Sequence, residues 1–419
     1  MNKNAIVVSL NDDTSEIMQL AGSLGYSVAK TFIQHKKIPD VTSYVGSGKI
    51  DEIKKYLEDC EDFVNLVIID GELKPSQWFV LEKELKLEVY DRVRLILAIF
   101  AERADGKEAK LQVKLAQLQY ERPFVRELIH RARAGEHPGF LAGGEYQVDD
   151  YYESIKKQTK RIKENLERIR SERDVRRRHR HTGGFYLVSL AGYTNAGKSS
   201  LLNILSDEQV KVEGRLFSTL STTTRKLSGK NFQILLTDTV GFIQNLPAWI
   251  IDAFHSTLEE IEVADVVLLV VDASDDKVIV EKKLKVSLDE LLEIGVTSPI
   301  IVALNKIDLL SEDELKLRVS YLQDSGLIKN REIIPISVKN RKNIDLLLGI
   351  VHDLLPHQSR IKIKLPSNEK TQSFISWIYE KAHISNISYD DYVVMDIECS
   401  TMIRDKILSK LNELEGSII

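Results

Sequence analysis

The chain has 419 residues, of which 43% are hydrophobic, enough for two to four domains with cores of their own. Its formal net charge of −5 at pH 7 gives no overall indication of nucleic-acid binding. The two cysteines, Cys60 and Cys399, have neither metal-ligand nor redox spacing, as is usual in a reducing cytosol. The first residues contain too short an apolar run for a signal peptide or membrane helix, so we expect a cytoplasmic protein without membrane contact.

Residues 1–90 alternate apolar runs with helical patterns and predict a small α/β domain with a parallel sheet. The expected strands are Ala5–Leu10, Tyr26–Ile33, Asn65–Asp70 and Leu87–Tyr90, and the expected helices are Asp13–Leu24, Lys49–Leu57 and Ser76–Leu85. Gly46-Ser-Gly48-Lys49 partly resembles a phosphate-binding loop. However, Ser43 stands where that pattern requires glycine, and Ile50 where it requires a hydroxyl. We therefore expect a turn that enters a helix.

Residues 91–181 predict a long helical hairpin. Asp91–Ala134 has leucines 111, 115 and 118 on one stripe, and Glu153–Arg180 has a narrow apolar face that includes Ile155 and Ile162. At 1.5 Å per residue, the second helix is on the order of 40 Å long. The segment between the helices, residues 134–144, contains four glycines and a proline, so we expect an irregular tip there.

Positive charge is concentrated in residues 153–180, where twelve basic and five acidic residues leave a net charge of +7. A basic helical hairpin with a flexible tip suits entry into a nucleic-acid cavity. The alternative is a solvated helix pair that only separates two domains. We expect contact with RNA, and the candidate residues are Lys160, Arg161, Arg176, Arg177, Arg178 and Arg180.

Residues 182–357 contain a phosphate-binding pattern, G-x-x-x-x-G-K-[ST], at Gly192–Ser199. The pattern lies between an expected strand, Phe185–Ala191, and an expected helix, Lys198–Leu205. In that context backbone N–H groups surround a phosphate at the helix N-terminus, although the pattern alone can also be an ordinary glycine turn. Lys198 would reach the β- and γ-phosphates, and Ser199 would supply an oxygen to Mg²⁺. The predicted phosphate-binding residues are Gly192, Tyr193, Thr194, Asn195, Ala196, Gly197, Lys198, Ser199 and Ser200.

A second motif follows the apolar run Phe232–Leu236. Asp238 is expected at the end of this strand, where its carboxylate can hold Mg²⁺, and Gly241 allows its N–H to approach the γ-phosphate. Leu220–Arg225 contains three consecutive threonines, one of which a GTPase needs to contact Mg²⁺ and the γ-phosphate. The predicted catalytic residues are Lys198, Thr223, Thr224 and Gly241, and the predicted metal ligands are Ser199, Thr223, Thr224 and Asp238.

Two further segments predict selection of the base. Asn305-Lys306-Ile-Asp308 follows an expected strand, Ile300–Leu304. The carboxylate of Asp308 can accept hydrogen bonds from guanine N1–H and the exocyclic amine, a donor pair that adenine lacks. Ser337–Lys339 follows an expected strand, Glu332–Ile336, and fits the weaker element that supports the base through backbone contacts. The predicted base-binding residues are Asn305, Lys306, Asp308, Ser337, Val338 and Lys339.

Two positions bear on the rate of hydrolysis. Many GTPases have a water-orienting glutamine directly after the Asp-x-x-Gly motif, but Phe242 occupies this position and cannot polarise water. We therefore expect slow intrinsic hydrolysis. Asn195 resembles the asparagine of potassium-dependent GTPases, where K⁺ stabilises charge near the phosphates as an arginine finger does. The alternative is that Asn195 is merely tolerated in the loop.

Residues 358–419 predict a small α+β module, with strands at Ile361–Leu365 and Tyr392–Ile397 and helices at Thr371–Ala382 and from Met402. The expected fold class is therefore α/β multidomain. It contains a P-loop GTPase domain with a mostly parallel sheet and flanking helices, preceded by the small α/β domain and the antiparallel hairpin.

Beyond the nucleotide motifs, most of residues 5–355 resemble the HflX family of GTPases. The segments concerned are Tyr44–Lys49, Asp70–Leu73 with Pro75 and Gln77, Tyr90–Arg92, Leu95–Arg103, Gln112–Tyr120, Asp238–Ile243, Leu246-Pro247 and Phe254–Glu260. The resemblance implies association with the large ribosomal subunit, with the hairpin tip near the peptidyl transferase region of ribosomal RNA. It also implies a role in splitting or rescuing stalled ribosomes under stress.

The chain departs from the family pattern at three places. Ser221 and Thr222 replace the usual Asp-Pro pair, and Ser199 replaces the commoner threonine. Tyr151 and Tyr152 stand where the family usually has arginines.

We interpret the chain as a GTP hydrolase that binds Mg²⁺ and is expected to be a monomer, and both interpretations of Asn195, a K⁺ site or a tolerated loop residue, stay open. Its expected partners are GTP and the large ribosomal subunit with its RNA. The alternative is an RNA-modification or RNA-chaperone adaptor that uses the nucleotide as a structural switch and does not act on ribosomes. A signalling GTPase that acts only through proteins would leave the charge of +7 unexplained.

Overall fold

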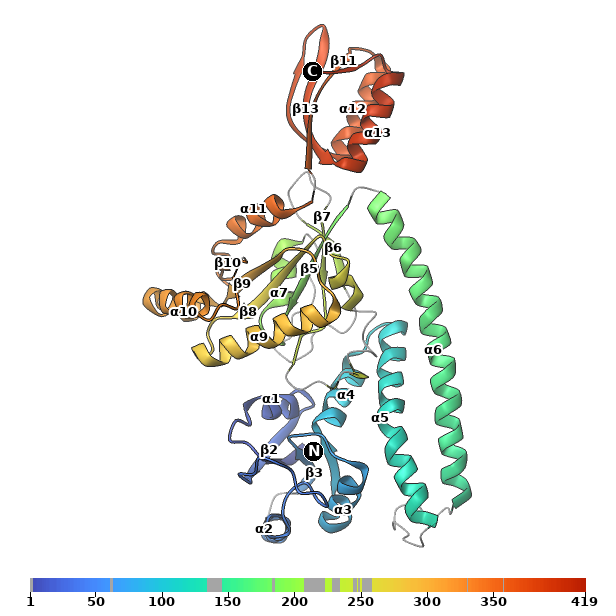
Figure 1. Ribbon diagram of the computed structural model, residues 1–419, viewed down its shortest axis with the longest axis vertical. Coiled ribbons are helices and arrows are strands. Elements are labelled where there is room, and N and C mark those ends of the chain that lie inside the picture. Colours follow the sequence, from blue (N-terminus) through green and yellow to red (C-terminus); the bar gives the residue numbers. More distant parts are fainter. Residues whose placement is uncertain are drawn as a thin grey trace. The chain divides into compact units, whose positions relative to one another are not determined.

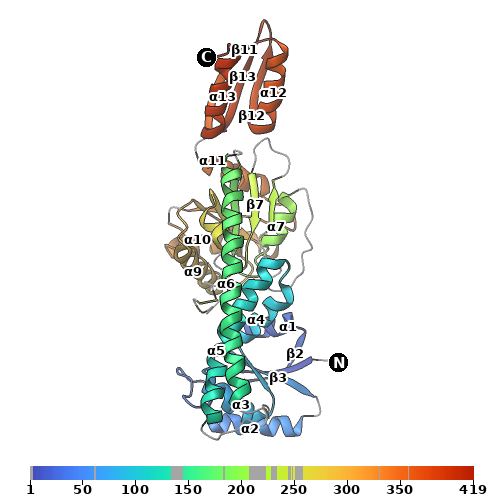
Figure 2. The same ribbon diagram turned by 90° about the vertical axis from the view of Figure 1, so that its right-hand side faces the viewer.

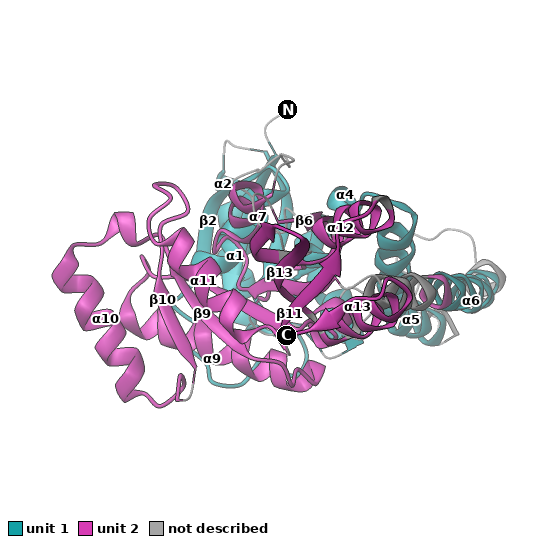
Figure 3. Ribbon diagram, turned by 90° about the horizontal axis from the view of Figure 1, so that it is seen from above, with its two compact units in different colours: residues 1–169, 215–220, 245–255 teal, residues 170–214, 221–244, 256–419 magenta. Residues whose placement is uncertain are grey.

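The computed structural model describes residues 3–60, 63–133, 145–182, 185–206, 223–227, 234–243, 247, 249–250, 258–329, 331–356 and 358–419. The chain divides into two compact units, coloured teal and magenta in Figure 3. The first unit contains residues 1–169, 215–220 and 245–255, and the second contains residues 170–214, 221–244 and 256–419. The finer division into four domains stays a prediction.

The first unit begins with a sheet of order β2-β1-β3-β4, in which neighbouring strands are parallel. Its elements are β1 (Lys3–Ser9), α1 (Ser15–Ser23), β2 (Tyr26–Ile33), α2 (Ser47–Asp59), β3 (Val64–Ile69), α3 (Pro75–Leu85) and β4 (Glu88–Asp91). The predicted parallel α/β arrangement is confirmed. Gly46 is the N-cap of α2, and Ser47, Gly48 and Lys49 form its first turn, so this segment enters a helix as expected.

Residues 92–133 form two helices, α4 (Arg92–Arg103) and α5 (Lys107–Arg133), rather than the single helix expected over Asp91–Ala134. The chain turns at Gly106, whose φ of +83° is left-handed and incompatible with a continuing α-helix. At the other end of α4, the Asp91 side chain accepts a hydrogen bond from the Arg94 N–H at 2.7 Å and caps the helix. The expectation of one continuous helix was therefore wrong.

Helix α5 packs antiparallel against α6 (Glu145–Thr182), as Figures 1 and 2 show. The seam buries Leu115, Leu118, Val125 and Ile129 of α5 against Ile155 and Ile162 of α6. The apolar stripes recognised in the sequence therefore face each other, and the predicted antiparallel hairpin is confirmed. Its predicted tip, residues 134–144, lies outside the described residues.

The second unit contains a sheet of order β10-β9-β8-β5-β7-β6, in which only the β6–β7 pair is antiparallel among the described strands. Its strands are β5 (Tyr186–Gly192), β6 (Thr223–Lys226), β7 (Ile234–Asp238), β8 (Val266–Asp272), β9 (Ile300–Asn305) and β10 (Glu332–Pro335). Its helices are α7 (Lys198–Leu205), α9 (Lys277–Ile294), η1 (Ile307–Leu309), α10 (Glu312–Asp324) and α11 (Ile344–Leu354). The mostly parallel sheet with flanking helices is confirmed.

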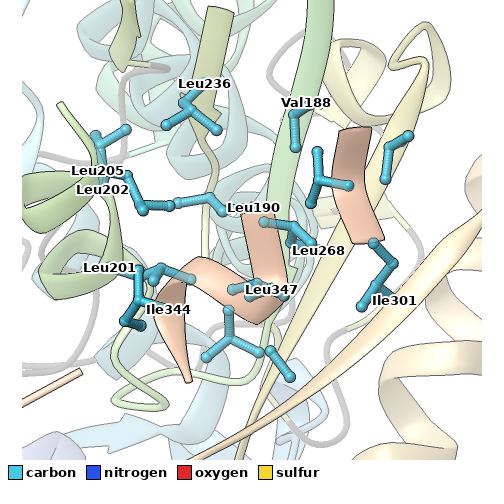
Figure 4. Packing of buried hydrophobic residues seen from close by; sticks show 14 of the residues in the cluster. Val188, Leu190, Leu201, Leu202, Leu205, Leu236, Leu268, Ile301, Ile344 and Leu347 are labelled. Carbon is cyan, nitrogen blue, oxygen red and sulfur yellow. The ribbon is translucent and has the colours of Figure 1, made fainter. Parts of the chain in front are cut away.

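The core of this sheet explains its sequence pattern. Leucines of α7 and Ile344 and Leu347 of α11 pack on strand residues such as Leu190 and Leu268 (Figure 4). Strand β8 reads VVLLVVD and is buried along almost its whole length. Parallel strands covered on both faces are continuously apolar rather than alternating, because neither face meets water.

Residues 358–419 form an antiparallel sheet of order β12-β13-β11-β14. Its elements are β11 (Gln358–Pro366), α12 (Glu369–Lys381), β12 (His383–Tyr389), β13 (Tyr392–Ser400), α13 (Thr401–Glu413) and β14 (Ser417–Ile418). This connectivity is ferredoxin-like. Both helices pack on the sheet through a common core, and Figure 2 shows them side by side. The predicted α+β module is confirmed, although β12 and β14 were not predicted.

Of the helices that the structure describes, none combines the length and the apolar character needed to cross a membrane.

Candidate nucleotide-binding site

The predicted phosphate loop connects β5 to α7, and its two glycines are required by geometry. Gly192 has a φ of +135°, and a Cβ there would lie 2.2 Å from the carbonyl oxygen of Val270. Gly197 has a φ of +100°, and a Cβ there would lie 2.3 Å from Asn305 Nδ2. Side chains would therefore clash at both positions, apart from the backbone strain. The glycines place the loop at the N-terminus of α7, where free N–H groups favour an anion.

Lys198 is buried within this loop. Its Nζ donates hydrogen bonds to the carbonyl oxygens of Gly192 and Tyr193, both at 2.9 Å. Desolvation by burial lowers the pKa of Lys198 to about 8, and the carboxylate of Asp238 only partly opposes this effect. A phosphate in contact with Nζ would stabilise the charged ammonium, so this lysine is suited to bind one.

Ser199 and Asp238 form the oxygen-rich part of the site. Ser199 Oγ donates to Asp238 Oδ2 at 2.6 Å, and both residues are buried. Because Mg²⁺ prefers one or two protein oxygens together with phosphate and water oxygens, this pair fits the metal. Thr223 lies opposite Asp238 on the β6–β7 ladder, and Thr224 Oγ1 is 3.1 Å from Thr237 Oγ1. Which threonine contributes to a metal site stays a prediction.

Gly241 and Phe242 attach the second motif directly to the phosphate loop. The Phe242 N–H donates to the Gly192 oxygen at 3.0 Å, and the Thr194 N–H donates to the Phe242 oxygen at 2.9 Å. A Cβ on Gly241 would lie 2.8 Å from Thr194 Cγ2 and 2.9 Å from Lys198 Nζ. The side chain of Phe242 is buried and has no group that could orient water.

Asn305 joins the phosphate loop to the predicted base-binding loop. Its Nδ2 donates to the Ala196 oxygen at 2.8 Å, and its Oδ1 accepts from the Val338 N–H at 3.1 Å. Asn305 is only 3% exposed, so both hydrogen bonds are shielded from water. The side chain thus connects segments that are 109 residues apart at one end and 33 at the other.

The remaining base-binding candidates gather beyond the ends of β9 and β10. Ser337 Oγ donates to Asp308 Oδ1 at 2.6 Å, which fixes the orientation of the carboxylate that would read guanine. Lys306 has a φ of +65°, and its Nζ forms an ion pair with Asp272 Oδ2 at 2.5 Å. Sequence reasoning missed Asp272, although its place at the end of the apolar run Val266–Asp272 could have indicated it. Lys339 is exposed beside this group.

The remaining predicted residues lie on the phosphate loop, on α7 and on α6. Asn195 is exposed and has a φ of +63°, and its role with K⁺ stays a prediction. Ser200 is half-buried on the first turn of α7. Lys160 and Arg161 are exposed on α6. The backbones of Arg176, Arg177, Arg178 and Arg180 belong to α6, but their side chains lie outside those that the structure describes.

Comparison with known protein families agrees with this geometry. Residues 11–101 match a family described as GTP-binding GTPase N-terminal, and residues 103–180 match the GTP-binding GTPase Middle Region. Residues 187–306 match the family described as 50S ribosome-binding GTPase. The three matches follow one another along the chain and include every phosphate-binding and metal-binding candidate.

Individual relatives cover nearly the whole chain. It is 39% identical over 407 residues to the GTPase HflX of Thermococcus kodakarensis, which spans 96% of this chain and 91% of the relative. The GTPase HflX of Methanocaldococcus jannaschii is 40% identical over 369 residues, or 88% of each chain. The crystal structure of the SsGBP and GDP complex is 29% identical and covers 84% of this chain and 98% of its own, with a TM-score of 0.51. The chain therefore belongs to the HflX family of GTPases, binds guanine nucleotide and hydrolyses GTP to GDP and phosphate.

Proposed function

We propose that the GTP cycle of this protein controls its association with the large ribosomal subunit, where the basic hairpin contacts ribosomal RNA. The proposal rests mainly on the presence, in one chain, of a nucleotide-binding site and a strongly basic helix, α6. Residues 153–180 have a net charge of +7, although the whole chain has −5. A polyanionic partner is what such an uneven distribution would attract. The match of residues 187–306 to a 50S ribosome-binding GTPase family supports this choice of partner.

Mg²⁺ belongs to the proposal as the ion that neutralises charge on the β- and γ-phosphates. Ser199, Asp238 and one of Thr223 and Thr224 would hold it. Lys198 would contact the same phosphates, and the N–H of Gly241 would approach the γ-phosphate. The contacts with the γ-phosphate exist only with GTP, so the chain around Thr223 and Gly241 would be held differently in the GTP and GDP states.

The buried side chain of Phe242 supports slow hydrolysis in the free protein. A phenylalanine cannot orient the attacking water, as the glutamine of many GTPases does, so hydrolysis by the free protein should be slow. We propose that contact with the large subunit completes the site and accelerates hydrolysis. More specifically, we propose that the protein splits or rescues stalled ribosomes. A factor that binds the large subunit in a GTP-dependent way can compete with the small subunit for it.

Co-sedimentation with separated ribosomal subunits tests the proposal. The protein would be incubated with each subunit and with a non-hydrolysable GTP analogue, GDP or no nucleotide, at several salt concentrations. We expect retention on the large subunit with the analogue, weakening steeply as salt rises. Equal retention on both subunits in every nucleotide state would contradict the proposal. Binding of free RNA without any subunit preference would instead favour an RNA-modification or chaperone adaptor.

A further inference from the structure

The hairpin contains a hollow of about 330 Å³ beside its apolar seam, within the first unit. One lining residue, Arg122, comes from α5, and the others come from α6: Lys156, Thr159, Lys160, Lys163 and Glu164. Four of the six lining residues are basic and one is acidic. The hollow is therefore strongly positive, and the methylene stems of its lysines form much of its wall.

The positive charge in this hollow is only partly balanced within the protein. Lys156 forms an ion pair with Glu153 at 2.7 Å, and Arg122 Nε donates to the Tyr152 hydroxyl at 3.4 Å. In the part of the chain that the structure describes, the ammonium groups of Lys160 and Lys163 have no hydrogen-bond or ion-pair partner. Both lysines are exposed, so their charges remain available to an external anion.

The surroundings of Tyr152, next to the hollow, are also positively charged. Arg122 and Lys156 lie over its ring, at 5.9 Å and 4.8 Å from the centroid. The hydrogen bond from Arg122, followed by the charges of Arg122, Lys156 and Arg126, lowers the pKa of the Tyr152 hydroxyl below its usual value. The nearby carboxylate of Glu121 is hydrogen-bonded to Tyr151 at 3.1 Å, and Glu164 lines the hollow itself. Cations therefore dominate the field here despite these acids.

We infer that this hollow binds consecutive phosphates of an RNA backbone. Lys156, Lys160 and Lys163 form a row along one side of α6, with a rise of about 10 Å from first to last. Such a row suits a chain of phosphates, whereas a single small anion would need convergent donors. Ile155 and Ile162 are buried in the adjoining seam, so the row stands on a packed helix pair. The inference rests on the proposed function and deepens it by naming Arg122, Lys156 and Lys163, which sequence analysis did not select.

The test compares two double variants of the full-length protein that remove the same charge. K160Q/K163Q changes the hollow, and K110Q/K157Q changes exposed lysines of the same two helices outside it. Binding to a fluorescent single-stranded RNA oligonucleotide would be measured by anisotropy over a range of KCl, with GDP saturating the nucleotide site. For single strands the slope of log K against log salt is about −0.7 per phosphate contact. We expect K160Q/K163Q to reduce the slope by about 1.4, and K110Q/K157Q to leave it unchanged.

An unchanged slope in K160Q/K163Q, or an equal reduction in both variants, would overturn the inference. Inorganic pyrophosphate provides a second arm with the GDP-saturated protein. Pyrophosphate binding that requires Lys160 and Lys163, combined with RNA binding that does not, would identify a small-anion site and overturn it as well. Circular dichroism would confirm that both variants retain their helices.

Failure of this inference can be separated from failure of the proposed function. If RNA binding depends on Lys160 and Lys163 but the protein does not retain ribosomal subunits, the hollow binds RNA and the ribosomal proposal is wrong. If K160Q/K163Q is retained on the large subunit with wild-type affinity and salt dependence, the ribosomal proposal stands and the hollow is not its contact.

Discussion

Replacing Asn305 by alanine should disconnect the phosphate loop from the base-binding loop. The amide makes two buried hydrogen bonds, to the Ala196 oxygen at 2.8 Å and from the Val338 N–H at 3.1 Å. Each is worth about 1 kcal/mol net, so the variant loses about 2 kcal/mol from the arrangement that binds nucleotide. At about 1.4 kcal/mol per factor of ten, GDP affinity should fall about 30-fold. The fall is larger if the Val338 N–H stays buried without a partner.

Titration with a fluorescent GDP analogue at 25 °C measures this loss. Asn340→Ala is the matched control, because Asn340 is exposed and, among the described residues, its side chain makes no hydrogen bond, whereas its backbone N–H donates to Ser337 Oγ at 3.1 Å. Its affinity should stay within about twofold of wild type, as is usual for surface substitutions. Asn305→Asp should bind GDP at least as poorly as Asn305→Ala, since a carboxylate oxygen would face the Ala196 oxygen. If Asn305→Ala bound GDP within about twofold of wild type, the bridge would not position the site.

Three further predictions concern the same site. Asp308→Asn should lower the preference for GDP over ADP by about 10- to 150-fold, since hydrogen bonds to charged groups are worth about 1.5–3 kcal/mol; an unchanged affinity ratio would contradict this assignment. Nucleotide affinity should be full well below pH 8, begin to fall near pH 8 and then fall by up to about tenfold per pH unit, because the pKa of Lys198 is about 8 in the free protein and phosphate contact raises it. Calorimetry should show proton uptake at pH 8.5 that is absent at pH 7 and reduced in Lys198→Arg, whereas identical proton uptake in both proteins would exclude Lys198 as its source. Gly241→Ala should reduce kcat for GTP about 5- to 150-fold, because the new Cβ would lie 2.8 Å from Thr194 Cγ2; a kcat within about twofold of wild type would show that the loop yields.

The order of elements along the chain could be predicted wherever one pattern ran without interruption. Helix α7 has the predicted bounds, Lys198–Leu205, because the glycine turn before it and its leucines agree on where it begins and what it buries. The break between α4 and α5 was missed because apolar residues continue on both sides of it. The Asp105-Gly106 pair was the available signal, since this dipeptide favours turns.

Strand β12 was missed for another reason. Its pairing with β13 shifts register between Ile384 and Asn386, and such an irregularity interrupts the period of two by which a strand is recognised. Its place at the edge of the sheet adds little burial to compensate. Neither the bulge nor the partner strand can be read from these seven residues alone.

The residue types of the site were easier to predict than the contacts between residues far apart in the sequence. Residue types at fixed spacing predicted Lys198, Ser199, Asp238 and Asp308, because phosphate, metal and guanine each require particular groups. The structure brings Lys198, Ser199 and Asp238 together, and their binding roles stay predictions. The ion pair between Lys306 and Asp272 depends instead on strands β8 and β9 lying side by side. The hollow in the hairpin likewise requires Arg122 of α5 beside the lysine row of α6, which depends on the register of two helices.

GTP hydrolysis in the presence of separated ribosomal subunits tests most directly whether the nucleotide site and the basic hairpin act together. We predict that the large subunit raises kcat well above the rate of the free protein and that the small subunit does not. K160Q/K163Q should need a higher concentration of large subunit for half-maximal stimulation, with an unchanged maximal rate. A rate that is independent of the large subunit, or raised equally by both subunits, would contradict control of this GTPase by the large ribosomal subunit.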